Sequence, residues 1–166
     1  MIFMTDSDFL NELKDDDKLE LVEPSLEICS SYLEKSDNCM KSAKLLFQND
    51  LFENSVSMSY YAMYNAATAL LFKVGIKCEN HNGTILIFKK LFGRFDLFKI
   101  ISFAKGERID KQYYVASKVD FIGKESAHDM LSKAENFTVQ TKLIIQNLKN
   151  EEIPLFRKKF ESLLTL

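Results

Sequence analysis

The hydrophobic and polar positions between residues 55 and 72 repeat with the period of an α-helix. One apolar face recurs at steps of three and four residues, and a stripe of small residues runs beside it. No charged residue occurs between Glu53 and Lys73. A helix with both stripes can be approached closely on two sides, which predicts the central helix of a bundle. Its serine, asparagine and threonine residues make it too polar for a membrane span. The apolar face consists of Val56, Tyr60, Met63, Ala67, Leu70 and Val74, and the small stripe of Ser55, Ser59, Ala62, Ala66 and Ala69.

The residues before this segment predict two more helices. Residues 5–14 begin with the capping cluster Thr-Asp-Ser-Asp and form a short amphipathic helix. An acidic, solvated linker follows, and Pro24 then opens a long helix. In that helix Leu26, Leu33, Met40 and Phe47 lie seven residues apart, as do Cys29, Ser36 and Ala43. The short polar break at Asn49-Asp50 makes it an antiparallel neighbour of the central helix, which ends near Gly75.

The second half of the chain predicts a polar loop at residues 76–83 and three further helices. The first carries Ile85, Phe88, Phe92 and Phe95, and the second carries Leu97, Ile101, Ala104 and Arg108. Residues 114–123 look irregular. The last long helix starts near Lys124 and is stopped by Pro154. An apolar tail with Leu155, Phe156, Phe160, Leu163 and Leu164 then either caps the core or binds a partner.

No segment of the sequence shows the pattern of a β-strand, so the predicted fold is all-α. We expect an antiparallel bundle of about five helices. The predicted division is an N-terminal extension at residues 1–23, the helical bundle at 24–153 and the C-terminal apolar tail at 154–166. A chain of 166 residues is long enough for one such domain with a substantial core.

The charge and the cysteine content limit the functions that the chain can have. The net charge is −2, so no global basic field drives non-specific binding to nucleic acid, and any such contact must come from a local cluster. The three cysteines form no CxxC pair, and the first residues lack the basic and apolar regions of a signal peptide. Reduced cysteines in a cytoplasmic protein are the simplest expectation.

The common catalytic motifs are missing from the sequence. There is no GxxxxGK[ST], GxGxxG or HExxH, and the two histidines are too few for a convincing metal site, so we expect no metal or cofactor. What remains is a small constellation: His81 and Asn82 after the central helix, and Arg108 with Tyr113 and Tyr114. Arginine can hold a phosphate and tyrosine can stack on a base. The alternative is that Arg108 forms a surface ion pair and the tyrosines are half-buried core residues.

The central segment Ser59-Tyr60-Tyr61-Ala62-Met63-Tyr64-Asn65-Ala66-Ala67 resembles the Tyr-Tyr-Ala-Met-Phe-x-Ala-Ala signature of HEPN domains (higher eukaryotes and prokaryotes nucleotide-binding). Gly75-Ile76-Lys77 with His81-Asn82-Gly83 is similar to the Gly-x-x…His-x-Gly of that family, and Arg108 with Tyr113 to its Arg-x-x-x-Asp-Tyr. The resemblance covers about residues 25–150. It implies a homodimeric bundle, often the partner of a minimal nucleotidyltransferase in a toxin–antitoxin or defence system.

Ribonuclease members of the family carry an arginine, then four to six intervening residues, then a histidine. Here Tyr113, Tyr114 and Val115 occupy the possible positions of that histidine, and Gln112 replaces the aspartate of the Arg-x-x-x-Asp-Tyr version. A tyrosine with a pKa near 10 is a poor base at pH 7. The sequence therefore favours a nucleotide- or RNA-binding protein, or a nucleotidyltransferase partner, in which Arg108 contacts phosphate.

Two alternatives to this binding role stay open. One is a metal-independent ribonuclease with a relocated base, His128 or His81. The other is a structural module whose function is dimerisation.

Overall fold

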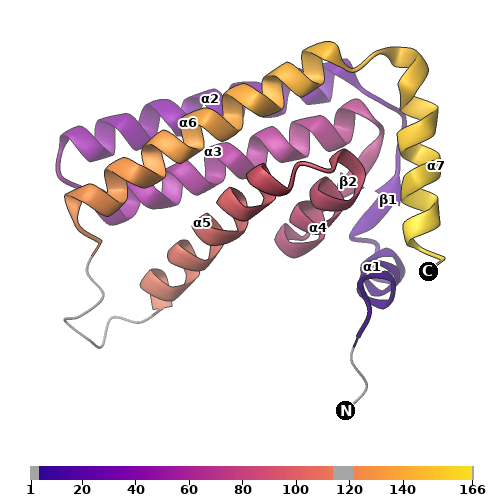
Figure 1. The fold of residues 1–166 in the computed structure, drawn as a ribbon, viewed down its shortest axis with the longest axis horizontal. Coiled ribbons are helices and arrows are strands. Elements are labelled where there is room, and N and C mark those ends of the chain that lie inside the picture. Colours follow the sequence, from indigo (N-terminus) through magenta and orange to yellow (C-terminus); the bar gives the residue numbers. More distant parts are fainter. Residues whose placement is uncertain (1–3, 114–121, 166) are drawn as a thin grey trace.

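The computed structural model describes residues 4–113 and 122–165, and for residues 109–113 it describes the backbone alone. These residues form a bundle of long helices with a smaller layer across one end (Figure 1). The helices are α1 (Asp6–Asp15), α2 (Leu26–Gln48), α3 (Phe52–Lys73), α4 (His81–Phe92), α5 (Phe95–Tyr113), α6 (Lys124–Asn147) and α7 (Ile153–Leu163). Two short strands, β1 (Leu19–Leu21) and β2 (Ile76–Cys78), and a 3-10 turn at Asn150–Glu152 complete the fold. The predicted all-α class is confirmed.

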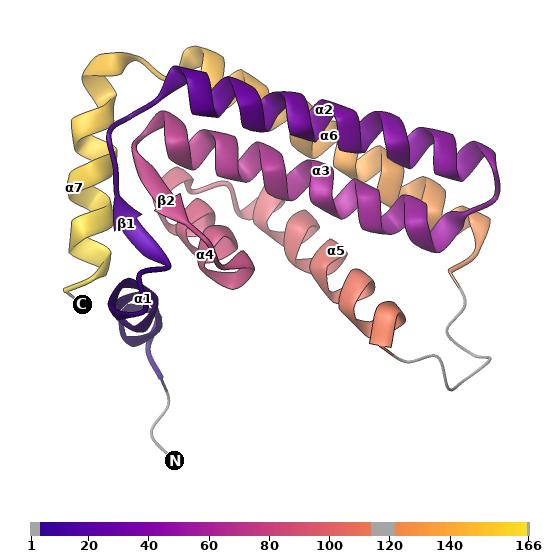
Figure 2. The ribbon, with the colours of Figure 1, turned by 180° about the vertical axis from the view of Figure 1, so that it is seen from behind.

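Helix α3 is the central element, as its periodicity predicts. Helices α2, α4, α5 and α6 all pack against it (Figures 1 and 2). Every residue of its predicted apolar face and its small-residue stripe is buried. The small stripe lets α2 approach closely enough for Ser36 Oγ to donate to the carbonyl of Ala62, and for Ser55 Oγ to donate to that of Ala43. The break at Asn49-Asp50 makes α2 and α3 an antiparallel hairpin, as predicted.

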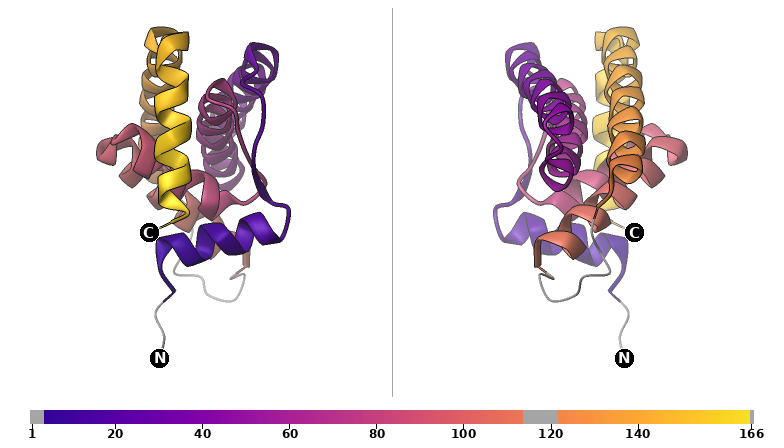
Figure 3. Two further views of the ribbon diagram at one scale, coloured as in Figure 1. Left: turned by 90° about the vertical axis from the view of Figure 1, so that its right-hand side faces the viewer. Right: turned by 90° about the vertical axis from the view of Figure 1, so that its left-hand side faces the viewer.

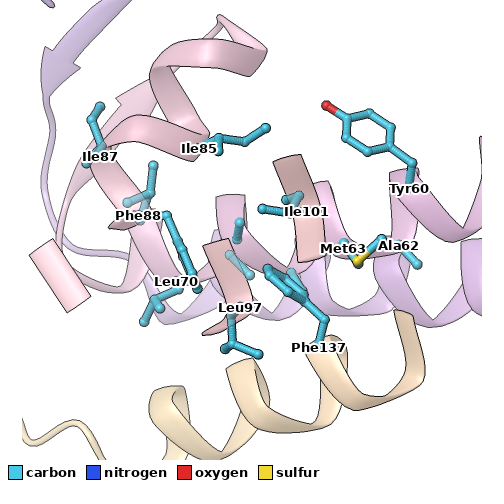
Figure 4. Close-up of a cluster of buried hydrophobic side chains, with 14 of the residues drawn as sticks. Tyr60, Ala62, Met63, Leu70, Ile85, Ile87, Phe88, Leu97, Ile101 and Phe137 are labelled. Carbon is cyan, nitrogen blue, oxygen red and sulfur yellow. The ribbon is translucent and has the colours of Figure 1, made fainter. Parts of the chain in front are cut away.

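The core lies where α3 meets the helices of the second half of the chain. Figure 4 shows Met63 and Leu70 of α3 converging with Phe88 of α4, Leu97 of α5 and Phe137 of α6. All five side chains are fully buried. Burying such side chains stabilises the fold by about 1.5–3 kcal/mol each, which explains why these helices hold together without a large sheet.

A second layer covers the end of the bundle near the start of α4. Strand β1 pairs antiparallel with β2, with Leu19 opposite Cys78 and Leu21 opposite Ile76. Figure 3 shows α1 lying crosswise below α7 at this end. Arg157 of α7 donates from Nη1 to the carbonyls of Val22 and Gly75 at 2.7 and 2.9 Å, so α7 holds both strands in place.

Some predictions are wrong in detail. Residues 76–83 are not a loop, because residues 76–78 form β2 and α4 already begins at His81. A three-residue strand is too short to show a period of two, and its pairing partner lies far away in the chain. The predicted helix that carries Ile85 and Phe88 does not reach Phe95, because Gly93 adopts a left-handed conformation that ends α4.

Pro154 does not stop the last long helix, which ends at Asn147; it lies instead in the first turn of α7. The apolar tail caps the core of its own chain, since Phe160 is buried and Phe156 packs on Phe92. Leu26, the first of the residues spaced seven apart in α2, is exposed. No helix in the described part of the chain combines the length and hydropathy of a membrane span.

Candidate functional site

Three helices bring a cluster of polar and aromatic side chains together at the edge of the core. Helix α3 supplies Tyr60, Tyr61 and Tyr64, α4 supplies His81, and α5 supplies Arg108. Tyr60 and Tyr64 are one helical turn apart and so lie on the same side of α3. Figure 4 shows Tyr60 at the margin of the apolar cluster, with its hydroxyl group directed away from the α3 backbone. Tyr60, which is fully buried, therefore connects the cluster to the core.

Arg108 is held by tyrosines rather than by a carboxylate. Its Nη1 donates to the hydroxyl oxygen of Tyr61 at 2.6 Å. Its guanidinium carbon lies 5.0 Å from the ring centroid of Tyr61 and 5.3 Å from that of Tyr60, within the range of cation–π attraction. Among the described residues no Asp or Glu forms an ion pair with it, and its buried Nε has no acceptor. Arg108 therefore forms no ion pair with a carboxylate of the described residues.

His81 is fixed by two tyrosines at the start of α4. The hydroxyl oxygen of Tyr60 lies 2.6 Å from Nδ1 of His81. The ring of Tyr64 stacks on the imidazole with centroids 3.9 Å apart and planes within 4°. Partial burial lowers the pKa of His81, and the positive charges of Arg108 and Lys105 lower it further. His81 is therefore neutral at pH 7.

The hydrogen bond to Tyr60 also selects the tautomer of His81. Burial raises the pKa of Tyr60 far above its ordinary value, so the phenol keeps its proton. Its described hydrogen-bond partner is Nδ1 of His81, and a buried hydroxyl proton is stabilised by donating to that nitrogen. We therefore assign Nδ1 as the acceptor and Nε2 as the protonated nitrogen, on the basis of this network. In this tautomer Nε2 of His81 can donate a hydrogen bond to an anion but cannot accept a proton from a ligand, because it already carries one.

Lys105 extends the positive charge beyond Arg108. It lies one helical turn before Arg108 on α5, and its Nζ donates to Oδ1 of Asn82. Burial lowers the pKa of Lys105, and the nearby charge of Arg108 lowers it further. Asn80 caps α4 by accepting from the backbone N–H of Gly83 at 2.9 Å. The positive end of the α4 dipole, Lys105 and Arg108 therefore act on the same region, which suits an anion.

A cavity of about 710 Å³ opens beside Arg108. Helices α2 and α3 supply most of its wall, including Leu46, Val56 and Met58. Its polar lining includes Tyr61 and Arg108 as well as the carboxylates of Glu53 and Glu107. A mainly apolar hollow with a few convergent polar groups is typical of small-molecule sites. Within the described residues no group of three His, Cys, Asp or Glu side chains is placed to bind a metal ion.

The structure brings some of the predicted site residues together but not all of them. Arg108, His81 and Asn82 come together around α4 and α5. The side chain of Tyr113 and all of Tyr114 lie outside the described residues, so their predicted role stays a prediction. His128 lies elsewhere, on α6, with its ring 5.8 Å from that of Phe47.

Sequence reasoning missed four residues of the cluster. Periodicity and the family signature explain Tyr60, Tyr61 and Tyr64 only as parts of a packed helix, although three tyrosines within five positions exceed what packing requires. Lys105 is the fourth. Its position one turn before Arg108, on the same face of α5, was the available signal.

Comparison with known proteins agrees with this architecture. The model of the HEPN domain matches residues 29–143, which span the segment from α2 to α6. A protein of Methanocaldococcus jannaschii named "Putative toxin MJ0605" is 28% identical over 127 residues, which cover 74% of this chain and 92% of that protein. A "UPF0332 protein" of Thermotoga maritima is 27% identical over 128 residues, covering 74% of this chain and 95% of the relative. The match extends over most of the chain and includes the tyrosines of α3, the start of α4 and Arg108, so this chain belongs to the HEPN domain family.

Proposed function

We propose that this chain is a toxin-like module that binds the phosphate groups of RNA or of a nucleotide, with Arg108 as the principal contact. The observation that carries the proposal is the environment of Arg108: two tyrosine rings and a tyrosine hydroxyl hold it, and no carboxylate among the described residues forms an ion pair with it. A guanidinium fixed in this way can bind a phosphate without first breaking an ion pair. The names of the relatives support the toxin-like context.

Lys105 and His81 both favour an anionic ligand beside Arg108. Lys105 adds a second cation, and the neutral His81 offers an N–H donor at Nε2. The cavity beside Arg108 has the apolar wall that a base or ribose requires.

The test is a titration of labelled ATP and a labelled short RNA into the wild type and Arg108→Ala. A charged hydrogen bond contributes about 1.5–3 kcal/mol, so we expect affinity to fall about 10- to 150-fold. Arg94→Ala is the matched control, because Arg94 also lies near α5 but is neutralised by Asp96 at 2.7 Å. Equal affinity of the wild type and Arg108→Ala for both ligands would remove Arg108 from the site.

A second candidate function is metal-independent RNA cleavage with His81 as the base. The observation in its favour is that His81 and Arg108 contact the same ring, that of Tyr60. To accept the proton of a 2′-hydroxyl, Nε2 would first have to lose its own, so Tyr60 would have to become an acceptor. Incubation of the wild type, His81→Ala and His128→Ala with total RNA separates the candidates. Absence of fragments at micromolar wild-type protein would exclude cleavage.

The predicted partners, a second copy of the chain and a nucleotidyltransferase, belong to the same proposal. Light scattering on the purified full chain measures the first, and co-purification with the product of a neighbouring gene measures the second. A monomer at high concentration would contradict the dimer.

A further inference from the structure

A second hollow lies on the other side of Lys105, between α4 and α5. Its volume is about 370 Å³, and it is distinct in lining from the cavity beside Arg108. The hydrogen bond between Lys105 and Asn82 crosses one end of it. At the other end the ammonium group of Lys89 lies 4.4 Å from the ring centroid of Phe98. The lining residues are Asn82, Ile85, Leu86, Phe98, Ser102, Lys105 and Gly106.

The two helices run antiparallel along this hollow, so it is a groove. Asn82 of α4 faces Lys105 of α5, and seven residues further along α4 Lys89 faces Phe98. At 1.5 Å per residue, the contacts that bound the groove are about 10 Å apart. Arg108 lies one turn beyond Lys105 and continues the line of cations into the larger cavity. The groove therefore ends about one helical turn from Arg108.

Among the described residues, the groove between α4 and α5 is lined by a cation and by no carboxylate, whereas Glu53 and Glu107 lie in the wall of the cavity beside Arg108. In the same part of the chain neither Lys89 nor Lys105 pairs with a carboxylate. By contrast Lys90, the neighbour of Lys89, pairs with Asp6, and Lys133 pairs with Asp129. The floor of the groove is apolar and includes an aromatic ring, while Asn82 and Ser102 add hydrogen-bonding groups at the rim.

We propose that the groove between α4 and α5 holds a single-stranded nucleic acid that continues into the Arg108 site, so the complete ligand is an oligonucleotide rather than a mononucleotide. This inference rests on the proposed function and specifies its ligand. Single-strand sites combine a positively charged groove that follows the backbone with aromatic rings on which bases stack. Here Lys89, Lys105 and Arg108 supply the charge, and Phe98 supplies the ring. An acidic peptide would use the cations but not the aromatic floor.

The experiment measures fluorescence anisotropy of labelled oligouridines of one to twelve nucleotides and of ATP, with the full chain. We expect affinity to rise with length over the first few nucleotides. Phe98→Leu should weaken binding of the eight-nucleotide strand about 5- to 150-fold, the range of one base–aromatic stack. Lys89→Glu should weaken it as well, because it replaces a cation beside the phosphates with a carboxylate. Both variants should leave ATP binding unchanged. Phe98→Leu keeps the apolar volume, and circular dichroism verifies that each variant is folded.

Lys133→Ala is the matched control. Its ammonium group also lies over a phenylalanine, Phe103, at 5.0 Å, but it is neutralised by Asp129, so we expect no change. Oligodeoxyuridine and polyglutamate of equal length complete the series. Tighter binding of RNA than of DNA would show that the groove selects RNA. Equal binding would show that it accepts single strands of both kinds.

Two results would overturn the inference while the proposed function stands. One is that Arg108→Ala loses both ATP and oligonucleotide while Lys89→Glu and Phe98→Leu lose neither. The other is that polyglutamate displaces the oligonucleotide at equal concentration. If Arg108→Ala binds both ligands as the wild type does, the proposed function itself fails.

Discussion

The hydroxyl oxygen of Tyr60 lies 2.6 Å from Nδ1 of His81 and joins the middle of α3 to the first residue of α4. This contact connects the core to the site, because Tyr60 is fully buried while His81 is only half-buried. It also determines which imidazole nitrogen carries the proton. The chemistry available at His81 is therefore set by a residue of the packed helix.

Tyr60→Phe should redistribute the proton of His81 between its two ring nitrogens. The variant keeps the ring packing but removes the donor to Nδ1, so the Nε2–H tautomer loses its preference. We expect a stability loss of about 1 kcal/mol, the contribution of one hydrogen bond. Nitrogen NMR of the imidazole rings measures the tautomer, with His128 as internal reference. A protonated Nδ1 in the wild type would contradict the assignment.

His81 should make the wild type less stable as the pH falls from 7.5 to 5. The folded-state pKa of His81 is lowered by burial and by Arg108 and Lys105, whereas the unfolded chain titrates near 6.5. Below about pH 6.5 the unfolded state binds more protons at this position, so acid favours unfolding. His81→Gln removes this contribution, and the difference in unfolding free energy between the two proteins should narrow on acidification.

Urea denaturation at a series of pH values measures this difference. Asp96, whose pKa is lowered to about 2 by Arg94, loses its contribution only at more acidic pH and does so in both proteins. His128→Gln is the control substitution. A wild-type minus variant difference that stays constant between pH 7.5 and 5 would refute the lowered pKa.

Gly83→Ala should destabilise the fold because α1 approaches α4 closely at this residue. A Cβ atom there would lie 2.6 Å from Cδ1 of Leu13 and 2.8 Å from Sγ of Cys78. Overpacking of this kind costs about 1–3 kcal/mol. Thermal unfolding measures the effect, and Leu13→Ala in the same chain should recover part of it.

Gly106→Ala is the matched control for Gly83→Ala. Gly106 lies inside α5, and apart from the backbone of its own helix no described atom lies within 4 Å of the point that a Cβ would occupy. Alanine should therefore raise stability by about 1 kcal/mol through helix propensity. Equal effects of the two substitutions would show that α1 does not press on α4.

Arg157→Met should loosen the layer formed by α7, β1 and β2. Nη1 of Arg157 donates to the carbonyls of Val22 and Gly75, and methionine keeps the apolar stem without the donor. We expect a loss of about 1.5–3 kcal/mol in unfolding free energy, because hydrogen bonds from charged groups are the stronger ones. Lys158→Met, at an exposed neighbouring position, should change stability by less than about 0.5 kcal/mol.

The long helices could be predicted from the sequence because apolar residues at helical spacing mark the buried face within each segment. Helix α6 begins at Lys124, as predicted, and the predicted face of α3 is buried throughout. The strands could not be predicted in this way, because three residues carry no readable period and pairing depends on a partner far along the chain. The role of Pro154 in α7 was missed for a related reason: a proline is compatible both with the end and with the first turn of a helix.

The sequence by itself determined the all-α class and the central position of α3. It also singled out Arg108, His81 and Asn82 as candidate site residues. Local spacing suffices for these, since a helix places its side chains by a fixed rotation per residue. Only the tertiary structure decided that Arg108 contacts Tyr60 and Tyr61, that Tyr60 holds His81, and that Lys105 joins them. These contacts connect α3, α4 and α5 across separations of up to 47 residues, and the packing of the helices, not their individual periodicity, sets which side chains meet.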